Sequence, residues 1–132
     1  MNDRAKSFVK EFLTRDTSLP GAIVAKTPDS LQGSLELLIL KTIDAGPNHG
    51  FGIVLHIQAV SEGLLRVEEG SLYPALHRLE KQGYLSAEWK QTDNRRRARY
   101  YRLTAAGRRR LTEAEVHWSA LAKGVQKVLR FA

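Results

Sequence analysis

The spacing of apolar residues changes at Gly83, and this change limits the possible folds more than any other feature of the chain. Before Gly83, three segments carry apolar residues every three or four positions, which is typical of helices with one buried face. After it, apolar and polar residues alternate through two short segments, which predicts strands. The sequence therefore predicts a mainly α fold with a small β-hairpin.

The three helices are predicted from about Ser34 to Ala45, from Gly50 to Ser61 and from Ser71 to Gln82. Turn residues follow each of them, as expected at helix ends. Pro74 fits the third helix only in its first turn, where a missing N–H costs little. The first helix has the clearest apolar stripe, which consists of Leu35, Leu38, Ile39, Thr42 and Ile43.

The hairpin is predicted from the strands Tyr84–Gln91 and Arg97–Leu103, with Asp93 and Asn94 suited to its turn. A dense group of arginines lies in and beside this turn. Like charges repel each other, so such a group is unfavourable unless a polyanion lies nearby. The group consists of Arg95, Arg96, Arg97 and Arg99.

A long helix is predicted from Ala105 to Arg130, with Thr104 as its N-cap. Its apolar residues alternate spacings of three and four, which is the a/d pattern of helix pairs. A helix of this length is too long to bury its whole seam on a small domain. We therefore expect a homodimer, with packing on its own domain as the alternative. The seam consists of Leu111, Ala114, Trp118, Leu121, Val125 and Val128.

The positive charge is concentrated in one part of the chain. The 132 residues have a net charge of +7, and residues 66–110 alone carry twelve Lys/Arg against five Asp/Glu. A concentrated basic region indicates a polyanion partner, with nucleic acid as the first candidate.

Several classes of protein are not indicated. The chain has no cysteine, which excludes disulfides, thiolate metal sites and a thiol nucleophile. The longest apolar run, Leu37–Leu40, is too short for a membrane span, so we expect a cytoplasmic protein. The histidines lack metal-ligand spacing, and Glu68 and Glu69 have no catalytic partner. We expect no metal, no cofactor and no enzymatic activity.

Three short helices followed by a basic hairpin are the plan of a winged helix-turn-helix, in which the third helix enters the major groove of double-stranded DNA. The hairpin would be the wing, with its arginines on phosphates or in the minor groove. RNA or a protein partner is the alternative use of the same basic surface. The DNA-facing candidates on the third helix are Ser71, Tyr73, Pro74, His77, Arg78 and Lys81.

Three stretches closely resemble the phenolic acid decarboxylase regulator family, usually called PadR. They read LELLILKTIDAGPNHGFGI, EEGSLYPALHRLEKQGYL and RRRARYYRLTAAG, and the resemblance extends from about Leu31 to Val128. It implies a transcriptional repressor that binds a palindromic operator and dimerises through its C-terminal helix. It also implies that the candidates on the third helix and the four wing arginines face DNA.

The chain departs from the family pattern at two places. Phe51 follows His49-Gly50 where the family usually has a tyrosine, so a hydroxyl contact is lost. The first 30 residues exceed the minimal family core. We divide the chain into an N-terminal extension (1–32) with a short helix at 4–15, a winged-helix domain (33–103) and a dimerisation helix (104–132).

Two groups leave alternatives open. Trp118 is either interface packing or, because members of this family can respond to small aromatic molecules, one wall of an effector pocket between subunits. Trp89 is expected to pack in the wing or the core. Arg108, Arg109 and Arg110 oppose the helix macrodipole, so they either contact the DNA backbone or form a slightly unfavourable solvated run.

Overall fold

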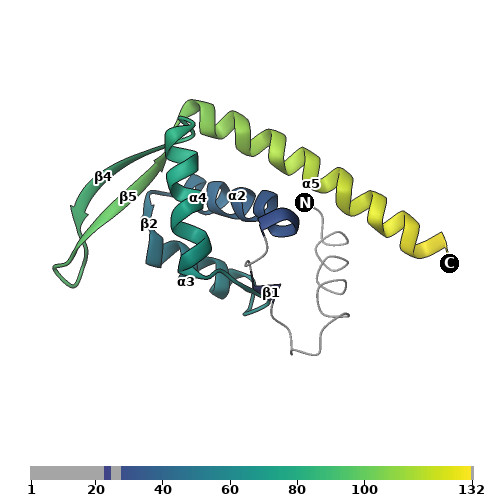
Figure 1. The fold of residues 1–132 in the computed structure, drawn as a ribbon, viewed down its shortest axis with the longest axis horizontal. Helices are drawn as coiled ribbons and strands as arrows, with labels where there is room; N and C mark the ends of the chain where they lie inside the picture. The colour runs from purple at the N-terminus through teal and green to yellow at the C-terminus, as the bar shows by residue number, and fades with distance from the viewer. Residues whose placement is uncertain (1–22, 25–27, 132) are drawn as a thin grey trace.

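The computed structural model describes residues 23–24 and 28–131, which form four helices and two small sheets (Figure 1). The helices are α2 (Pro28–Asp44), α3 (Gly50–Val60), α4 (Glu69–Lys81) and α5 (Ala105–Phe131). The strands are β1 (Ile23–Val24), β2 (Asn48–His49), β3 (Leu65–Arg66), β4 (Leu85–Gln91) and β5 (Arg97–Leu103). The mainly helical fold with a β-hairpin is the one that the apolar spacing predicts.

Helices α2, α3 and α4 surround one hydrophobic core, which the base of the hairpin closes. Four of the five residues in the predicted stripe of the first helix are buried, and Leu38 is half-buried. From the hairpin, Leu85, Tyr101 and Leu103 complete the core. Its most deeply buried side chains are Ile39, Leu40, Ile53, Leu72 and Leu76.

The hairpin is an antiparallel pair that extends away from the helices (Figure 1). Its register runs from Leu85 opposite Leu103 to Gln91 opposite Arg97, which confirms the predicted strands. Strand β2 adds to the outer edge of β5, and β1 pairs with β3 in a separate parallel sheet. These three strands have two residues each, too few for the alternation that predicts a strand.

Two helix starts differ from the prediction. Helix α2 begins at Pro28 rather than Ser34, because a proline suits a first turn while the residues after it carry no apolar stripe. Helix α4 begins at Glu69, which moves Pro74 into the second turn. The expectation that Pro74 lies in the first turn is wrong. In a regular helix, the N–H of residue 74 would donate a hydrogen bond to the carbonyl of Gly70. Proline has no N–H, but Gly70 is exposed, so water can reach that carbonyl instead.

The start of α5 is anchored to the loop between α4 and β4. The hydroxyl of Thr104 accepts a hydrogen bond from the Gly107 N–H (3.0 Å), which confirms the predicted N-cap. The same hydroxyl donates to the carbonyl of Gly83 (2.7 Å), and the Thr104 N–H donates to the carbonyl of Tyr84 (3.1 Å). Beyond this root, α5 lies over α2 and then continues past it (Figure 1).

The predicted helix at residues 4–15 lies outside the described residues. Within residues 23–24 and 28–131, no helix is both long enough and apolar enough to cross a membrane.

Candidate nucleic-acid interface

Helix α4 presents one polar face to solvent. Leu72, Ala75, Leu76 and Leu79 bury the opposite face in the core. The sequence candidates on the polar side follow from this arrangement: Pro74, His77, Arg78 and Lys81 are exposed, Tyr73 is 47% exposed and Ser71 is half-buried. The structure therefore brings all six candidates to the open side of one helix. Burial and the neighbouring carboxylate of Glu69 raise the pKa of the Tyr73 phenol above its usual value.

The tip of the hairpin carries two arginines that are exposed to solvent. The Arg95 N–H donates to the carbonyl of Thr92 (2.9 Å), and the Thr92 N–H donates to the carbonyl of Arg96 (2.7 Å). Arg95 has a φ of 63°, the left-handed conformation that glycine usually supplies in such a loop. A non-glycine residue there costs about 1–3 kcal/mol. The turn thus holds Arg95 and Arg96 at the far end of the wing.

The other two arginines of the wing group, Arg97 and Arg99, contact the protein itself. Arg97 and Arg99 lie against the ring of Trp89, at 5.5 and 5.9 Å from its centre. Trp89 is 56% exposed, so of its two predicted environments it packs in the wing. The guanidinium of Arg99 also hydrogen-bonds to the carboxylate of Glu80 on α4, which raises the pKa of Arg99. Arg99 therefore joins the wing to helix α4.

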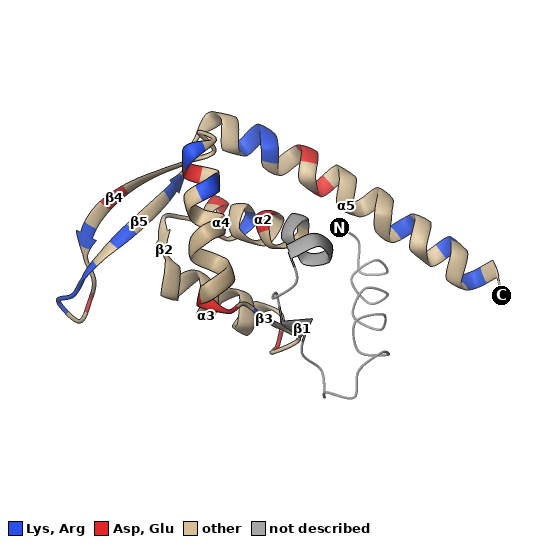
Figure 2. Cartoon of the chain, viewed as in Figure 1, with Lys and Arg blue, Asp and Glu red and all other residues tan. Residues whose placement is uncertain are grey.

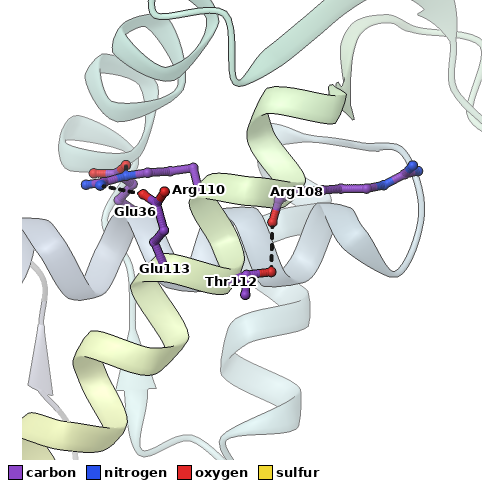
Figure 3. Close-up of polar contacts among 5 residues, drawn as sticks. All are labelled: Glu36, Arg108, Arg110, Thr112 and Glu113. Carbon is purple, nitrogen blue, oxygen red and sulfur yellow. Dashed lines mark hydrogen bonds and ion pairs between the residues drawn. The ribbon is translucent and has the colours of Figure 1, made fainter.

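The three arginines at the start of α5 have different surroundings. Arg110 forms an ion pair with Glu36 of α2 (2.9 Å) and a longer one with Glu113 (3.8 Å), and the Glu36 contact raises its pKa (Figure 3). Arg108 points away from this cluster (Figure 3), and Arg109 is exposed. Arg110 therefore fits neither predicted alternative, a contact with the DNA backbone or a solvated run. Its positive charge opposes the helix dipole, and the carboxylate of Glu36 offsets this unfavourable interaction.

The charged residues have a clear distribution over the fold. Figure 2 shows Lys and Arg along the wing, at one end of α4, at the beginning of α5 and again in the second half of α5. Glu88 lies among them on β4, where it pairs with Lys90 (3.1 Å) and Arg102 (3.6 Å). The arrangement offers guanidinium and ammonium groups to an anionic partner along one helix and one hairpin.

His49 has a structural role. Its Nδ1 accepts a hydrogen bond from the Gly52 N–H (3.1 Å), so it is the N-cap of α3. Within the described ranges, 23–24 and 28–131, no three His, Asp or Glu side chains are grouped as metal ligands would be.

The seam residues of α5 divide into two sets. Leu111 is buried in the core of its own domain, whereas Ala114, Trp118 and Val125 are half-buried. Leu121 and Val128 are 49% and 72% exposed, so two large apolar side chains on one side of the helix are open to solvent. The first half of α5 packs on α2, where Leu111 enters the core and Glu115 forms an exposed ion pair with Lys41 (2.9 Å). The exposed part of the seam therefore lies in the second half.

Comparison with known proteins identifies the family. Residues 39–113, more than half of the chain, match the Transcriptional regulator PadR-like family. The chain belongs to this family. It is therefore a transcriptional regulator and not an enzyme, and the family's activity is DNA-binding regulation.

Two curated relatives are similar to parts of this PadR-like chain. One is "Transcriptional regulator Rv3488" of Mycobacterium tuberculosis, which is 47% identical over 68 residues. That alignment covers 52% of this chain and 63% of the relative, so it spans less than two thirds of that protein. The other is an uncharacterized protein of Lysinibacillus sphaericus, 28% identical over 69% of this chain and 84% of the relative.

Solved structures of transcriptional regulators share the fold. A PadR family transcriptional regulator from Eggerthella lenta has a TM-score of 0.62 and 30% identity, and the match covers 96% of this chain and 93% of that one. A transcriptional regulator from Clostridium thermocellum has a TM-score of 0.69 and 28% identity, over 75% of this chain and 96% of that one. The fold is thus the winged helix of PadR-like regulators.

Proposed function

We propose that this PadR-like protein is a repressor that binds a palindromic operator as a homodimer. Helix α4 enters the major groove, and the wing arginines lie on the phosphate backbone or in the minor groove. The observation that carries this proposal is the open polar face of α4 beside a wing whose tip holds two exposed arginines. Arg97, at the tip end of β5, and Arg99, farther from the tip, add positive charge beside them. Both lie against Trp89, and Arg99 also pairs with Glu80.

The dimer is proposed from the exposed half of the α5 seam. Leu121 and Val128 lie seven residues apart on the same side of the helix, so a second α5 related by two-fold symmetry covers both. Ala114, Trp118 and Val125 border this strip and are only half-buried within one chain. Leu111 is already covered by its own domain, so we assign the contact to the residues after it.

We also propose that a small aromatic molecule can release the operator by binding beside Trp118. The indole ring is half-buried on α5, at the border of the strip assigned to the dimer. Two-fold symmetry would bring two such rings near each other and offer flat apolar surfaces to an aromatic ligand. The alternative, in which Trp118 only packs in the interface, predicts no quenching of its fluorescence by such ligands.

Fluorescence anisotropy on DNA from the region upstream of the gene tests the proposed function, with a shuffled duplex beside it. We expect saturable binding to the native duplex with a preference of at least ~10³-fold over the shuffled one. Equal weak binding to both duplexes would contradict sequence-specific recognition and favour RNA or a protein as the partner.

Replacing Arg96 by alanine should weaken binding to the native and shuffled duplexes about equally. Arg96 is at the exposed wing tip, where a phosphate contact carries no base information. Losing one phosphate contact lowers the slope of log affinity against log salt by about 0.9. Titrations at several salt concentrations measure this slope, and an unchanged slope would rule out a wing–phosphate contact at Arg96.

Replacing Arg95 by glycine should stabilise the protein and weaken DNA binding at the same time. Glycine removes the strain of the left-handed backbone, which costs about 1–3 kcal/mol, but it also removes one charge from the wing tip. Urea unfolding measures the first effect and the salt slope the second. Arg95→Lys is the control, because it keeps both the strain and the charge and should behave like the wild type. A glycine variant that binds DNA as well as the wild type would show that Arg95 does not contact DNA.

A further inference from the structure

Gly50 and Tyr73 are in close contact at the place where two helices meet. Gly50 is the first residue of α3 and is buried, and Tyr73 lies on the open side of α4. A Cβ atom at position 50 would lie 2.7 Å from Cε1 of Tyr73, 2.9 Å from its hydroxyl oxygen and 3.0 Å from Cζ. The phenol ring therefore occupies the space that a side chain at position 50 would need.

This contact differs from that at Gly107, where an added Cβ would meet the backbone carbonyl of Tyr84, in what would have to move. At position 50 the crowded atoms belong to the far end of a side chain, which can turn about its own bonds. A methyl group there would displace the ring and leave both helices in place. The absence of a side chain at Gly50 thus leaves room for the Tyr73 ring in its observed position.

The amino end of α3 is itself held in a fixed position. Asn48 accepts a hydrogen bond from the His49 N–H (2.8 Å), and His49 caps the helix. The His49 ring meets the Tyr100 ring of β5 edge to face, with 5.1 Å between their centres. Gly50 is therefore tied to the base of the wing, and the Tyr73 ring rests on this fixed support.

We infer that Gly50 is a positioning residue for operator recognition: by lacking a side chain, it sets the direction in which helix α4 presents Tyr73 to DNA. The inference rests on the proposed function, because it assigns Tyr73 a contact with the operator. Gly50 itself touches no base. Its effect on recognition passes through the phenol ring of Tyr73, a residue that is 47% exposed.

A double-mutant cycle tests this inference with Gly50→Ala, Tyr73→Ala and the double variant. We expect Gly50→Ala to lower affinity for the native upstream duplex about tenfold, the scale of one lost base contact, with little effect on the shuffled duplex. In the Tyr73→Ala background the same change should have no further effect. An equal loss in both backgrounds, or no loss in either, would overturn the inference.

A measurement without DNA separates this inference from the proposed function. Fluorotyrosine labelling gives one ¹⁹F resonance for each tyrosine, and the Tyr73→Phe variant assigns that of Tyr73. Gly50→Ala should shift this resonance and leave that of Tyr84 unchanged. An unshifted Tyr73 resonance would refute the positioning role even if the operator is found. A shifted resonance in a protein that shows no preference for the native duplex would instead contradict the proposed function.

The double variant also serves as the control for folding. If the added methyl group prevents Gly50→Ala from folding, removal of the Tyr73 ring should restore the melting temperature, because the crowded atoms are then absent. A Gly50→Ala/Tyr73→Ala protein that remains unfolded would show that position 50 is constrained by something other than the ring, and the inference would fail.

Discussion

Replacing Leu121 by arginine should convert the protein into a monomer and reduce operator affinity by at least ~10²-fold, the scale on which a second linked binding site contributes. Leu121 is a large apolar side chain that is half-exposed within one chain. Two-fold symmetry places the same position of both subunits at one interface, so the variant would bury two like charges without partners. Light scattering gives the mass of the particle, and anisotropy gives the affinity for the native duplex.

The control for this experiment is Val116→Arg. Val116 is also an exposed apolar residue of α5, but its place in the helical repeat puts it on roughly the opposite side from Leu121. The same charge there should leave both the mass and the affinity unchanged. A Leu121→Arg protein that remains a dimer would refute the seam, and a Val116→Arg protein that dissociates would move the interface to the other side of the helix.

Replacing Gly107 by alanine should destabilise the protein by about 1–3 kcal/mol, the usual cost of overpacking a filled site. The added Cβ would lie 2.1 Å from the carbonyl oxygen of Tyr84 and 2.8 Å from Cδ1 of Leu103. That carbonyl also accepts the Thr104 N–H, so it cannot move away without losing a hydrogen bond. Urea unfolding at a fixed protein concentration measures the change.

Gly124→Ala is the matched control, because it makes the same substitution in the same helix. A Cβ at position 124 would meet no atom within 4 Å. Alanine is a better helix former than glycine, so the free energy of unfolding of this variant should rise by about 0.8–1 kcal/mol. The two variants should therefore change stability in opposite directions. A Gly107→Ala protein as stable as the wild type would show that α5 does not pack tightly on the Tyr84 carbonyl.

The sequence predicts best what depends on local spacing. The alternation around Leu85 and Tyr101 predicted the two strands, and the amphipathic pattern predicted which face of α4 is open. The starts of α2 and α4 were missed because both helices begin before the apolar residues on which the prediction rests. The alternation also placed Trp89 on the face of Leu85 but could not show that the hairpin extends beyond the core there.

Some arginines are paired with carboxylates of other elements and some are exposed, and the sequence could not show which. The pairs join residues that are far apart in the chain. Glu80 with Arg99 and Glu36 with Arg110 are pairs between different elements, and only their folded positions bring them together. The same holds for Gly50 and Tyr73, which no motif links. A run of arginines in the sequence is therefore a poor guide to which of them are available to DNA.

The root of α5 has a mechanical consequence for the proposed dimer. This helix has 27 residues and is about 40 Å long, and its first turn is clamped by Gly83, Tyr84 and Thr104 beside the end of α4. Because the helix is attached to the domain at one end, a tilt of about 5° at that end displaces its far end by about 3.5 Å. In the proposed dimer, the two chains meet through their α5 helices, so the separation of the two α4 helices depends on that small angle. In the proposed dimer, the spacing of operator half-sites that the protein tolerates would then depend on how the start of α5 packs at Gly107.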